Sequence, residues 1–391
     1  MTACDTGPIV SWLVDGARSA QRPEAFVAEL CERMVEAGIP LWRVSVFART
    51  LHPEIMGRRF VWQPGAPVTV TEGPFTLLDD DRFQHSPFIA VITSGQAIRQ
   101  RLTADADQFS IYSELRDQGA TDYLSSPLVF TDGSVHVATW STQQAGGFTD
   151  AQMAGIESII APMARVTEIR ALQRTAANLL DAYVGHHASE RILAGNIRRG
   201  DTELLHSVIW LSDMRGFSAL ADQLPPQTVV DLLNRFFDCQ VPTIVAHGGE
   251  VLKFIGDGLL AIFPLTGGAA EVRAVCERAL AAAREAQANI DAIEEPAPPG
   301  NADGPRFGLA LHLGEVLYGN IGSGNRLDFT TIGPAVNLAA RLEKLAGRLG
   351  RTIILSAAFA DYADGAIEPL GAFDIAGFAT KQRAFGLAAR G

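Results

Sequence analysis

A single interruption divides a long apolar run in the second half of the chain. Residues 250–263 read EVLKFIGDGLLAIF, and a Gly-Asp-Gly triplet separates two strand-like segments. Because Gly and Asp favour tight turns, we expect the two segments to pair as a hairpin with Asp257 at its tip. Upstream, the apolar segment 206–213 also ends in a carboxylate, Asp213. The chain is therefore expected to contain a sheet that presents two acidic side chains at strand ends.

These two carboxylates have a chemical and a structural interpretation. If their strands are neighbours, Asp213 and Asp257 meet at one sheet edge and can share hard divalent cations, which prefer oxygen ligands. Alternatively, each Asp only stabilises a turn or caps a helix. The residues after the first carboxylate favour the chemical interpretation, because Gly216 permits close backbone approach and Phe217 and Ser218 open a helix with unpaired N–H groups. Such a turn can hold a triphosphate.

The first 150 residues have the alternating character of an α/β module. Residues 24–37 place apolar side chains four apart, which predicts a helix. A Thr-Asp-Gly turn at 131–133 lies between two strand-like segments and predicts a hairpin. Further strands are expected at 42–48, 58–63 and 67–72.

A long helix is expected after this module. Thr149 and Gln152 have the spacing of a capping box, and an apolar stripe at steps of three and four follows. A narrow stripe of this kind suits a parallel helix pair, so a coiled-coil-like linker is expected at 156–203. The alternative is a helix packed on its own domain. The stripe consists of Ile156, Ile159, Met163, Val166, Ile169, Leu172, Ala176, Leu179 and Tyr183.

Strands and helices alternate with Gly turns from about residue 204 onward. This pattern predicts an α/β sandwich with helices on one face. A Pro- and Gly-rich loop at 294–305 precedes a strand that has the composition of a buried one. The segment 319–326, GNIGSGNR, has the glycine spacing of a Walker A motif but lacks its Lys and its Ser or Thr. Its glycines are therefore interpreted as a turn after that strand.

The last long helix, expected at 334–347, carries a polar pair. Asn337 and Arg341 are four residues apart and therefore share one face of the helix. An amide and a guanidinium placed together can orient a ribose and stabilise charge that develops on a phosphate. The alternative is that Arg341 pairs with Glu343 or Glu277 at the surface.

Composition limits the partners of the chain. It has 391 residues, enough for two or three domains, and a net charge of −12, which disfavours a nucleic-acid partner. No apolar run approaches the roughly 18 residues of a membrane span, and the N-terminus has no basic segment before an apolar one. A soluble, cytoplasmic chain is expected. The four cysteines are far apart and form no CxxC pair, which indicates neither a zinc site nor a disulfide framework.

Four motifs follow one another in the last half of the chain. They are WLSDMRGFS at 210–218, EVLKFIGDGLLAIF at 250–263, HLGEVLYGNIGS at 312–323 and DFTTIGPAVNLAARLE at 328–343. In order and spacing they resemble the catalytic domain of the class III nucleotidyl cyclases. The resemblance implies a mixed α/β domain of ferredoxin-like, palm type. It also implies a homodimer in which the metal carboxylates of one protomer face the nucleotide-reading residues of the other.

The resemblance assigns roles to the acidic and polar residues already noted. It implies that Asp213 and Asp257, helped by the carbonyl of Met214, bind two catalytic Mg²⁺ or Mn²⁺ ions. Asn337 and Arg341 match the pair that stabilises the transition state in the family.

Two further positions bear on the base of the nucleotide. Lys253 and Thr330 match the purine-reading positions of the family, where guanylate cyclases typically have Glu and Cys or a similar residue. A Lys can donate to adenine N1, and a Thr hydroxyl can accept from the N6 amine, so the combination favours ATP.

One position departs from the family. Cyclases commonly have a Lys-Gly element near the C-terminus whose Lys approaches the phosphates, and this sequence has Ala376 before Gly377. Lys381 or Arg383 could substitute. Both could equally be exposed loop charges.

The resemblance implies that the ribose 3′-hydroxyl of ATP attacks the α-phosphate and releases pyrophosphate. A guanylate cyclase and a nucleotide-binding module without turnover are the alternatives. The first part of the chain resembles a GAF-type sensor in its hairpin and following helix, and it is expected to respond to an unidentified small molecule or protein. The expected domains are a sensor at 1–155, a helical linker at 156–203 and a cyclase domain at 204–391.

Overall fold

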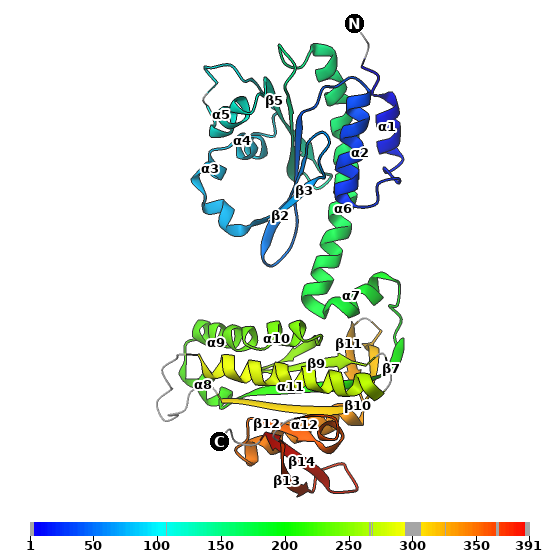
Figure 1. Cartoon of the computed structure of the whole chain (residues 1–391), viewed down its shortest axis with the longest axis vertical. Helices are drawn as coiled ribbons and strands as arrows, with labels where there is room; N and C mark the ends of the chain where they lie inside the picture. Colours follow the sequence, from blue (N-terminus) through cyan, green and yellow to red (C-terminus); the bar gives the residue numbers. More distant parts are fainter. Residues whose placement is uncertain are drawn as a thin grey trace. The chain divides into compact units, whose positions relative to one another are not determined.

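The chain divides into two compact units, Met1–Ala182 and Tyr183–Gly391 (Figure 1). The division falls near the end of the long helix α6 (Asp150–Val184). The computed structural model describes residues 4–106, 108–265, 267, 269–293, 306–324, 326–364 and 367–387. The loop predicted at 294–305 lies outside these residues, as does Asn325 of the glycine-rich segment.

The first unit is built on an antiparallel sheet. Its strands follow the order β3-β2-β1-β6-β5-β4. They are β1 (Arg43–Arg49), β2 (Ile55–Trp62), β3 (Thr69–Pro74), β4 (Ile98–Arg101), β5 (Asp122–Val129) and β6 (Val135–Thr142). The helices are α1 (Gly7–Val14), α2 (Pro23–Glu36), α3 (Asp81–Gln84), α4 (Pro87–Ser94), α5 (Ser110–Asp117) and α6, with a 3₁₀ helix η1 at Phe75–Asp79.

Two local predictions for this unit are confirmed. Strands β5 and β6 pair around the turn at 131–133, where Gly133 has a φ of +83°. At the start of α6, the Thr149 N–H donates to Gln152 Oε1 at 2.9 Å, and the Gln152 N–H donates to Thr149 Oγ1 at 3.3 Å. These reciprocal bonds are those of a capping box.

Helices cover both faces of this sheet, but the two faces carry different kinds of side chain. Helices α1, α2 and α6 lie against one face, and helices α3 to α5 lie on the other (Figure 1). The first face carries the core, in which Trp62 and Trp140 pack with Leu30 and Met34 of α2. The opposite face is mixed, with Arg43, Ser45 and Thr139 beside Phe47 and Tyr123.

Helix α6 changes character along its length. Ile156 and Met163 are fully buried in the core of the first unit. By contrast, Ile169, Leu172 and Tyr183 are 55%, 62% and 83% exposed. The first half of α6 therefore packs on its own domain, as the alternative interpretation of the stripe predicted. For the second half, pairing with another helix stays a prediction.

Acid is expected to destabilise the first unit through His136. The Nδ1 of this buried ring accepts the Arg49 N–H at 3.0 Å, and Ser134 Oγ lies 3.2 Å from Nε2. Burial, assisted by the Arg49 cation, lowers the pKa of His136 from 6.5 to about 4, although Asp132 and Glu168 oppose the shift. A depressed folded-state pKa means that stability is lost as the pH falls from about 6.5 towards 4, by about 3 kcal/mol in total.

His136→Asn should remove this part of the acid sensitivity, because the Asn amide does not titrate. The measurement is denaturant-dependent labelling of Cys31, which is buried in the first unit. His85→Asn, which changes an exposed histidine of the same unit, is the control and should keep the wild-type pH dependence. Equal pH slopes for His136→Asn and the wild type would contradict the prediction.

The second unit contains a mixed sheet with the order β13-β14-β12-β10-β7-β9-β8, and β11 pairs with β10. Among these pairs, β10 and β12 are parallel. The strands are β7 (Thr202–Arg215), β8 (Glu250–Ile255), β9 (Gly258–Pro264), β10 (Arg306–Ser323), β11 (Arg326–Ile332), β12 (Ile353–Ser356), β13 (Ile367–Phe373) and β14 (Gln382–Leu387). The helices are α7 (His186–Leu193), α8 (Phe217–Gln223), α9 (Pro226–Asp238), α10 (Val241–Ala246), α11 (Ala269–Asp291), α12 (Pro334–Arg348) and α13 (Ala357–Ala360).

The prediction of helices on one face of this sheet is wrong. Val208 and Trp210 of β7 pack with α9, α10 and α11, whereas the intervening Ile209 packs with Ala335 and Ala339 of α12. Successive side chains of a strand point to opposite faces, so β7 is apolar on both sides and needs helices on both.

The interpretation of the 319–326 glycines as a turn is also wrong in part. Gly319 and Gly322 lie inside β10, which continues to Ser323 and pairs with β11. A Cβ on Gly319 would come 2.1 Å from the Asp201 carbonyl oxygen. Glycine is required there by close backbone approach, not by a chain reversal.

Candidate active site

The two predicted metal carboxylates meet at one edge of the second sheet. The register of β7 and β9 pairs Asp213 with Gly258, so Asp257 in the preceding turn lies next to Asp213. The two side chains are within hydrogen-bonding contact. Gly258 permits this approach, because a Cβ there would come 2.9 Å from the Ser212 carbonyl oxygen. The predicted hairpin and the meeting of the two carboxylates are thus both observed.

Electrostatics at this edge favour a bound cation. Burial raises the pKa of Asp213 to about 7, and the neighbouring Asp257 and Glu343 carboxylates add to the rise. Arg215 opposes it. Two carboxylates that are forced together in this way hold either a proton or a metal ion, because their mutual repulsion must be neutralised.

The donor set fits hard divalent ions. Asp213 and Asp257 supply carboxylate oxygens, and the Met214 carbonyl follows Asp213 near the end of β7. Within the described part of the chain, no group of three or more His, Cys, Asp or Glu side chains is arranged to hold a metal. Mg²⁺ is often held by one or two carboxylates together with water and substrate phosphates, so this small set is sufficient.

A turn with free N–H groups follows the first carboxylate. Gly216 adopts a φ of +76° at the start of α8, a conformation that glycine reaches without strain. The Ala219 and Leu220 N–H groups donate to the Gly216 carbonyl, which leaves those of Phe217 and Ser218 without a backbone acceptor among the described residues. Gly216 lies three residues after Asp213 in the sequence.

An ion pair that the sequence did not predict ties this strand end to α12. Arg215 Nη1 lies 2.5 Å from Glu343 Oε1, and Arg215 Nη2 donates to the Glu343 carbonyl at 2.9 Å. The Glu343 side chain is only 3% exposed. Burial raises the pKa of Glu343, while the Arg215 guanidinium acts to lower it. The alternative pairing of Arg341 with Glu343 is therefore wrong, because Arg215 takes that carboxylate.

The predicted transition-state pair lies on the outer face of α12. Asn337 and Arg341 are both exposed, whereas the residue that follows each of them, Leu338 and Leu342, is buried. Among the described residues, no carboxylate pairs with Arg341. The structure does not bring Asn337 or Arg341 into contact with the Asp213 and Asp257 carboxylates of the same chain.

The predicted purine-reading residues lie on β8 and β11, which are not paired with each other in the sheet. Lys253 on β8 forms an ion pair with Asp328 on β11, with a distance of 2.5 Å between Nζ and Oδ2. Thr330 follows two residues later on β11, so its side chain is on the same face as that of Asp328. The Thr330 hydroxyl is buried and has no hydrogen-bond partner within the described residues. Asp328 is the residue here that sequence reasoning missed.

Comparison with known proteins agrees with this geometry. The family described as Adenylate and Guanylate cyclase catalytic domain matches residues 205–372. Residues 205–372 form an adenylate and guanylate cyclase catalytic domain. The match covers the carboxylate pair, the Lys253 and Thr330 positions and the exposed face of α12.

Named relatives share this cyclase domain. An adenylate cyclase of Anabaena cylindrica is 31% identical over 165 residues, which are 41% of this chain and 31% of the relative. The terminal-differentiation-specific adenylate cyclase of Dictyostelium discoideum is 30% identical over 166 residues, 41% of this chain and 7% of the relative. The chain thus spans less than a third of the length of either relative.

Solved cyclase structures are also similar. A bacterial light-regulated adenylyl cyclase is 29% identical, with a TM-score of 0.41 over 47% of this chain and 91% of that one. A guanylyl cyclase is 26% identical, with a TM-score of 0.38 over 50% of this chain and 96% of that one.

Lys381 lies outside the residues of the matched cyclase domain. It precedes β14, where its Nζ is 3.4 Å from Asp374 Oδ2, and both side chains are largely exposed. Arg383, the other candidate for the phosphate-contacting position, is exposed on β14. The structure brings neither residue into contact with Asp213 or Asp257.

A helix must be both long and apolar to cross a bilayer. In the described residues, none is both long enough and apolar enough to cross a membrane.

Proposed function

We propose that the chain is an adenylate cyclase that converts ATP to 3′,5′-cyclic AMP and pyrophosphate. The observation that carries this proposal is the contact between the half-buried carboxylates of Asp213 and Asp257 at the edge of a cyclase domain. Both carboxylates are present, and so are Asn337 and Arg341, which a nucleotide-binding module without turnover could lose.

The metal site in this proposal consists of Asp213, Asp257 and the Met214 carbonyl. Mg²⁺ or Mn²⁺ bound there would supply positive charge to the triphosphate and would ease deprotonation of the ribose 3′-hydroxyl. The protein's own part is to hold the carboxylates in place through β7 and the β8–β9 turn. Phe217 and Ser218 would add backbone N–H donors to the phosphates.

Two side chains support ATP over GTP. Lys253 Nζ can donate to adenine N1, an acceptor, whereas guanine N1 is itself a donor. The Thr330 hydroxyl has no hydrogen-bond partner among the described residues and could accept a hydrogen bond from the adenine N6 amine. In this arrangement Lys253 would exchange part of its contact with Asp328 for the base.

A homodimer with shared sites is part of the proposal. Its support is that Arg341 and Asn337 lie exposed on α12, away from the carboxylates of their own chain. In a dimer, Arg341 would stabilise charge on an α-phosphate bound at the partner's metal site, and Asn337 would orient the ribose. The exposed apolar side chains Ile169, Leu172 and Tyr183 of α6 provide a surface for a second contact.

We also propose that the first unit regulates this activity. The support is the continuity of α6, which runs from the core of the first unit to the boundary of the second. A change in the packing of Ile156 or Met163 would alter how α6 pairs in the dimer, and so how the cyclase domains meet.

The test of the proposed activity is the cyclic nucleotide formed from ATP or GTP with Mn²⁺ by the purified chain. We expect cyclic AMP from ATP, and little or no cyclic GMP from GTP. Asp213→Asn, which keeps the shape of the side chain but removes its charge, should lower the rate by about a hundredfold or more. Cyclic GMP as the main product would support the guanylate cyclase alternative. Mn²⁺-dependent ATP binding without product would support the binding module.

A further inference from the structure

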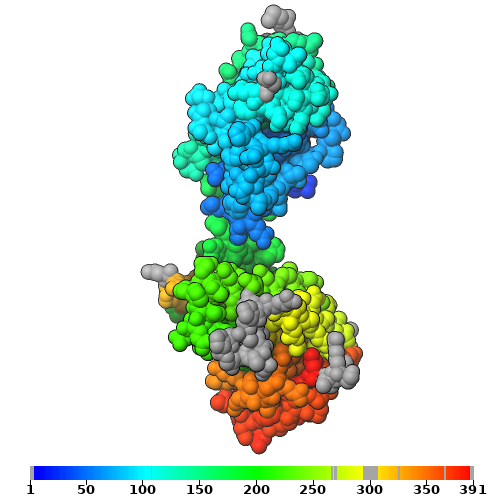
Figure 2. Space-filling model, turned by 90° about the vertical axis from the view of Figure 1, so that its left-hand side faces the viewer, coloured from blue at the N-terminus to red at the C-terminus, as the bar shows by residue number. Residues whose placement is uncertain are grey.

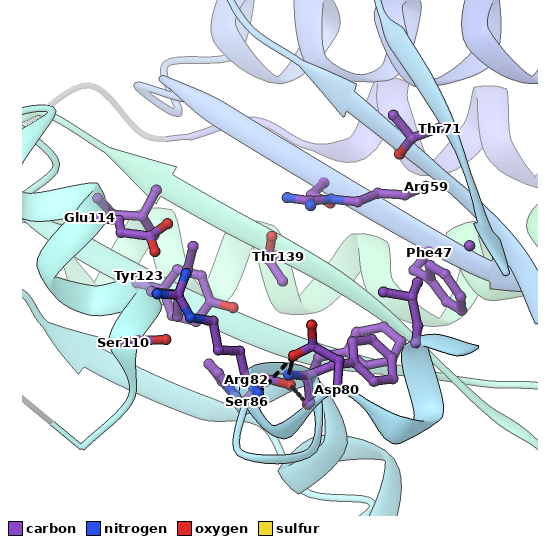
Figure 3. Close-up of a pocket in the computed structure, with 18 of the residues that line it drawn as sticks. Phe47, Arg59, Thr71, Asp80, Arg82, Ser86, Ser110, Glu114, Tyr123 and Thr139 are labelled. Carbon is purple, nitrogen blue, oxygen red and sulfur yellow. Dashed lines mark hydrogen bonds between the residues drawn. The ribbon is translucent and has the colours of Figure 1, made fainter. Parts of the chain in front are cut away.

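The sheet of the first unit turns its mixed face towards α3, α4 and α5. In the register of β1 and β6, Arg43 lies opposite Ser141, and Ser45 lies opposite Thr139. Together with Arg59 of β2 they line a pocket of about 470 Å³ (Figure 3). This volume is typical of a small-molecule site. Figure 2 shows this side of the unit, where the segments of α3 to α5, in cyan, form the outer surface.

Arg59 is the central cation of this pocket. Its Nε donates to Ser45 Oγ at 3.0 Å, which fixes the side chain on the sheet. In Figure 3 the Arg59 side chain extends from β2 across the sheet, towards Thr139 and Tyr123. Packing around the group and the neighbouring Arg43 cation lower the pKa of the Arg59 guanidinium, while solvent still reaches the side chain. No carboxylate among the described residues forms an ion pair with Arg59.

The acidic residues next to the pocket do not neutralise this charge. Glu72 accepts hydrogen bonds from Arg58 at 2.7 and 3.1 Å. Asp80 accepts hydrogen bonds from two backbone N–H groups at the start of α3. Glu114 lies on α5, at the end of the pocket where Tyr123 is found (Figure 3). An anion bound at the end of the pocket with Arg43 and Arg59 would therefore meet two guanidinium groups, and the acidic residues nearby would compete little with it for them.

Aromatic rings border the cationic end. Phe47 lies opposite Arg59 in the β1–β2 register. The Phe47 and Phe88 rings meet edge to face with 4.8 Å between centroids, and Phe83 lies 5.3 Å from Phe88. Rings in such clusters offer apolar and edge contacts to another ring. The pocket thus combines an aromatic wall with a guanidinium fork.

We propose that this pocket binds a small aromatic carboxylate, with its carboxylate on Arg59 and its ring against Phe47 and Phe88. The planar guanidinium fork matches the two oxygens of a carboxylate, and Arg43 adds a second positive charge. Ser45 holds the fork in position, so little side-chain entropy is lost when the ligand binds. The inference concerns binding to the first unit alone and does not depend on the reaction of the second.

The experiment compares two probes with the same ring system, 2-naphthoate and its uncharged amide, 2-naphthamide. Calorimetric titration of the full chain should show saturable binding of 2-naphthoate. The amide should bind about tenfold or more weakly, because it lacks the charge-assisted hydrogen bonds to Arg59. The readout is heat of binding, so it is independent of whether the chain makes a cyclic nucleotide.

Substitutions at two positions of the same strand separate this site from other basic surfaces. Arg59→Met should lower the affinity for 2-naphthoate by about tenfold to a hundredfold and should leave 2-naphthamide binding nearly unchanged. Arg58→Met is the matched control, because Arg58 points to the opposite face of β2, where it pairs with Glu72. Its affinity for 2-naphthoate should equal that of the wild type. Arg59→Lys keeps the charge without the fork and should fall between the two.

Three outcomes would overturn the proposal. One is the absence of saturable 2-naphthoate binding up to millimolar concentration in a folded wild-type chain. Another is equal affinity for the acid and the amide, which would show that the ring alone is recognised. The third is a loss of binding in Arg58→Met but not in Arg59→Met, which would move the site to the other face of the sheet. Circular dichroism of each variant establishes that the fold is retained.

Discussion

Mixing Asp257→Ala protein with Arg341→Ala protein is expected to restore cyclase activity that neither variant has alone. Each variant should lose about a hundredfold or more of the activity, because one lacks a metal carboxylate and the other lacks the cation that meets the phosphate. In a homodimer with shared sites, a heterodimer of the two variants keeps one site with all of its groups. Equal mixing makes half of the dimers mixed, so we expect about a quarter of the wild-type rate.

The structure gives this expectation its physical basis. Asp213 and Asp257 lie on the side of β7 that faces α12. On that side the Arg215–Glu343 ion pair connects β7 to α12. Arg341, two residues before Glu343, points to the other side of the helix and is exposed. A single chain therefore presents a carboxylate half-site and a separate guanidinium half-site.

The measurement is cyclic AMP formation after the variants have been incubated together at a concentration that forms dimers. Arg348→Ala is the matched control, since Arg348 is another exposed cation of α12 and should keep near wild-type activity. Chains of different mass, separated by tags, report the fraction of mixed dimers. If mixed dimers form and the rate stays at the level of the single variants, the shared-site arrangement is wrong.

Arg215→Met is expected to destabilise the second unit by about 3 kcal/mol. The substitution leaves the nearly buried Glu343 carboxylate without the guanidinium that lies 2.5 Å away, and it also removes a hydrogen bond to the Glu343 carbonyl. Removing one partner of a buried ion pair costs far more than removing both, because an uncompensated charge remains. Arg215→Met combined with Glu343→Gln should therefore regain much of the loss.

The loss should also depend on pH. Burial already raises the pKa of Glu343, and without Arg215 nothing comparable opposes that rise. A raised folded-state pKa of a carboxyl group means that stability is present at low pH and is lost as the pH rises through the folded-state value. Arg215→Met should therefore be more destabilising at pH values well above the ordinary pKa of Glu than near it.

Labelling of Cys276, which is buried in the second unit, measures this loss, and Cys31 in the first unit serves as an internal reference. The matched control is Arg351→Met. Arg351 pairs with Glu368 at 2.6 Å, but both side chains are more than a third exposed, so the effect should stay below about 1 kcal/mol. Equal losses in Arg215→Met and Arg351→Met would show that the Glu343 carboxylate finds another partner or stays neutral.

Local sequence patterns predicted much of the chain. The turn around Gly133, the capping box of Thr149 and Gln152, and the strands on both sides of Asp257 all depend on residues close in sequence. Backbone preferences and side-chain periodicity act over this range, which is why these elements could be read directly. The short helices α3 to α5 were not predicted, because they lack a long apolar period.

The candidate site also has a part that the sequence predicted and a part that it did not. The motifs pointed to Asp213 and Asp257, and the β7–β9 register brings them together. The partners of their neighbours were not evident: Arg215 takes Glu343 from 128 residues away, and Lys253 takes Asp328 from 75 residues away. Ion pairs at such separations depend on which helix lies against which strand. The apolar periodicity of a sequence does not show which helix packs against which strand.

Sequence alone therefore specified the strand-ending carboxylates, the hairpin between two apolar strands and the polar pair on α12, since each is a matter of residue type and spacing. Three features arose only when distant segments came into contact. They are the packing of helices on both faces of β7, the burial of Glu343 beside Arg215, and the polar side chains of the sheet around Arg59. Burial and charge pairing are properties of three-dimensional neighbours. In this protein those neighbours determine which of its many arginines are structural and which are free to meet a ligand.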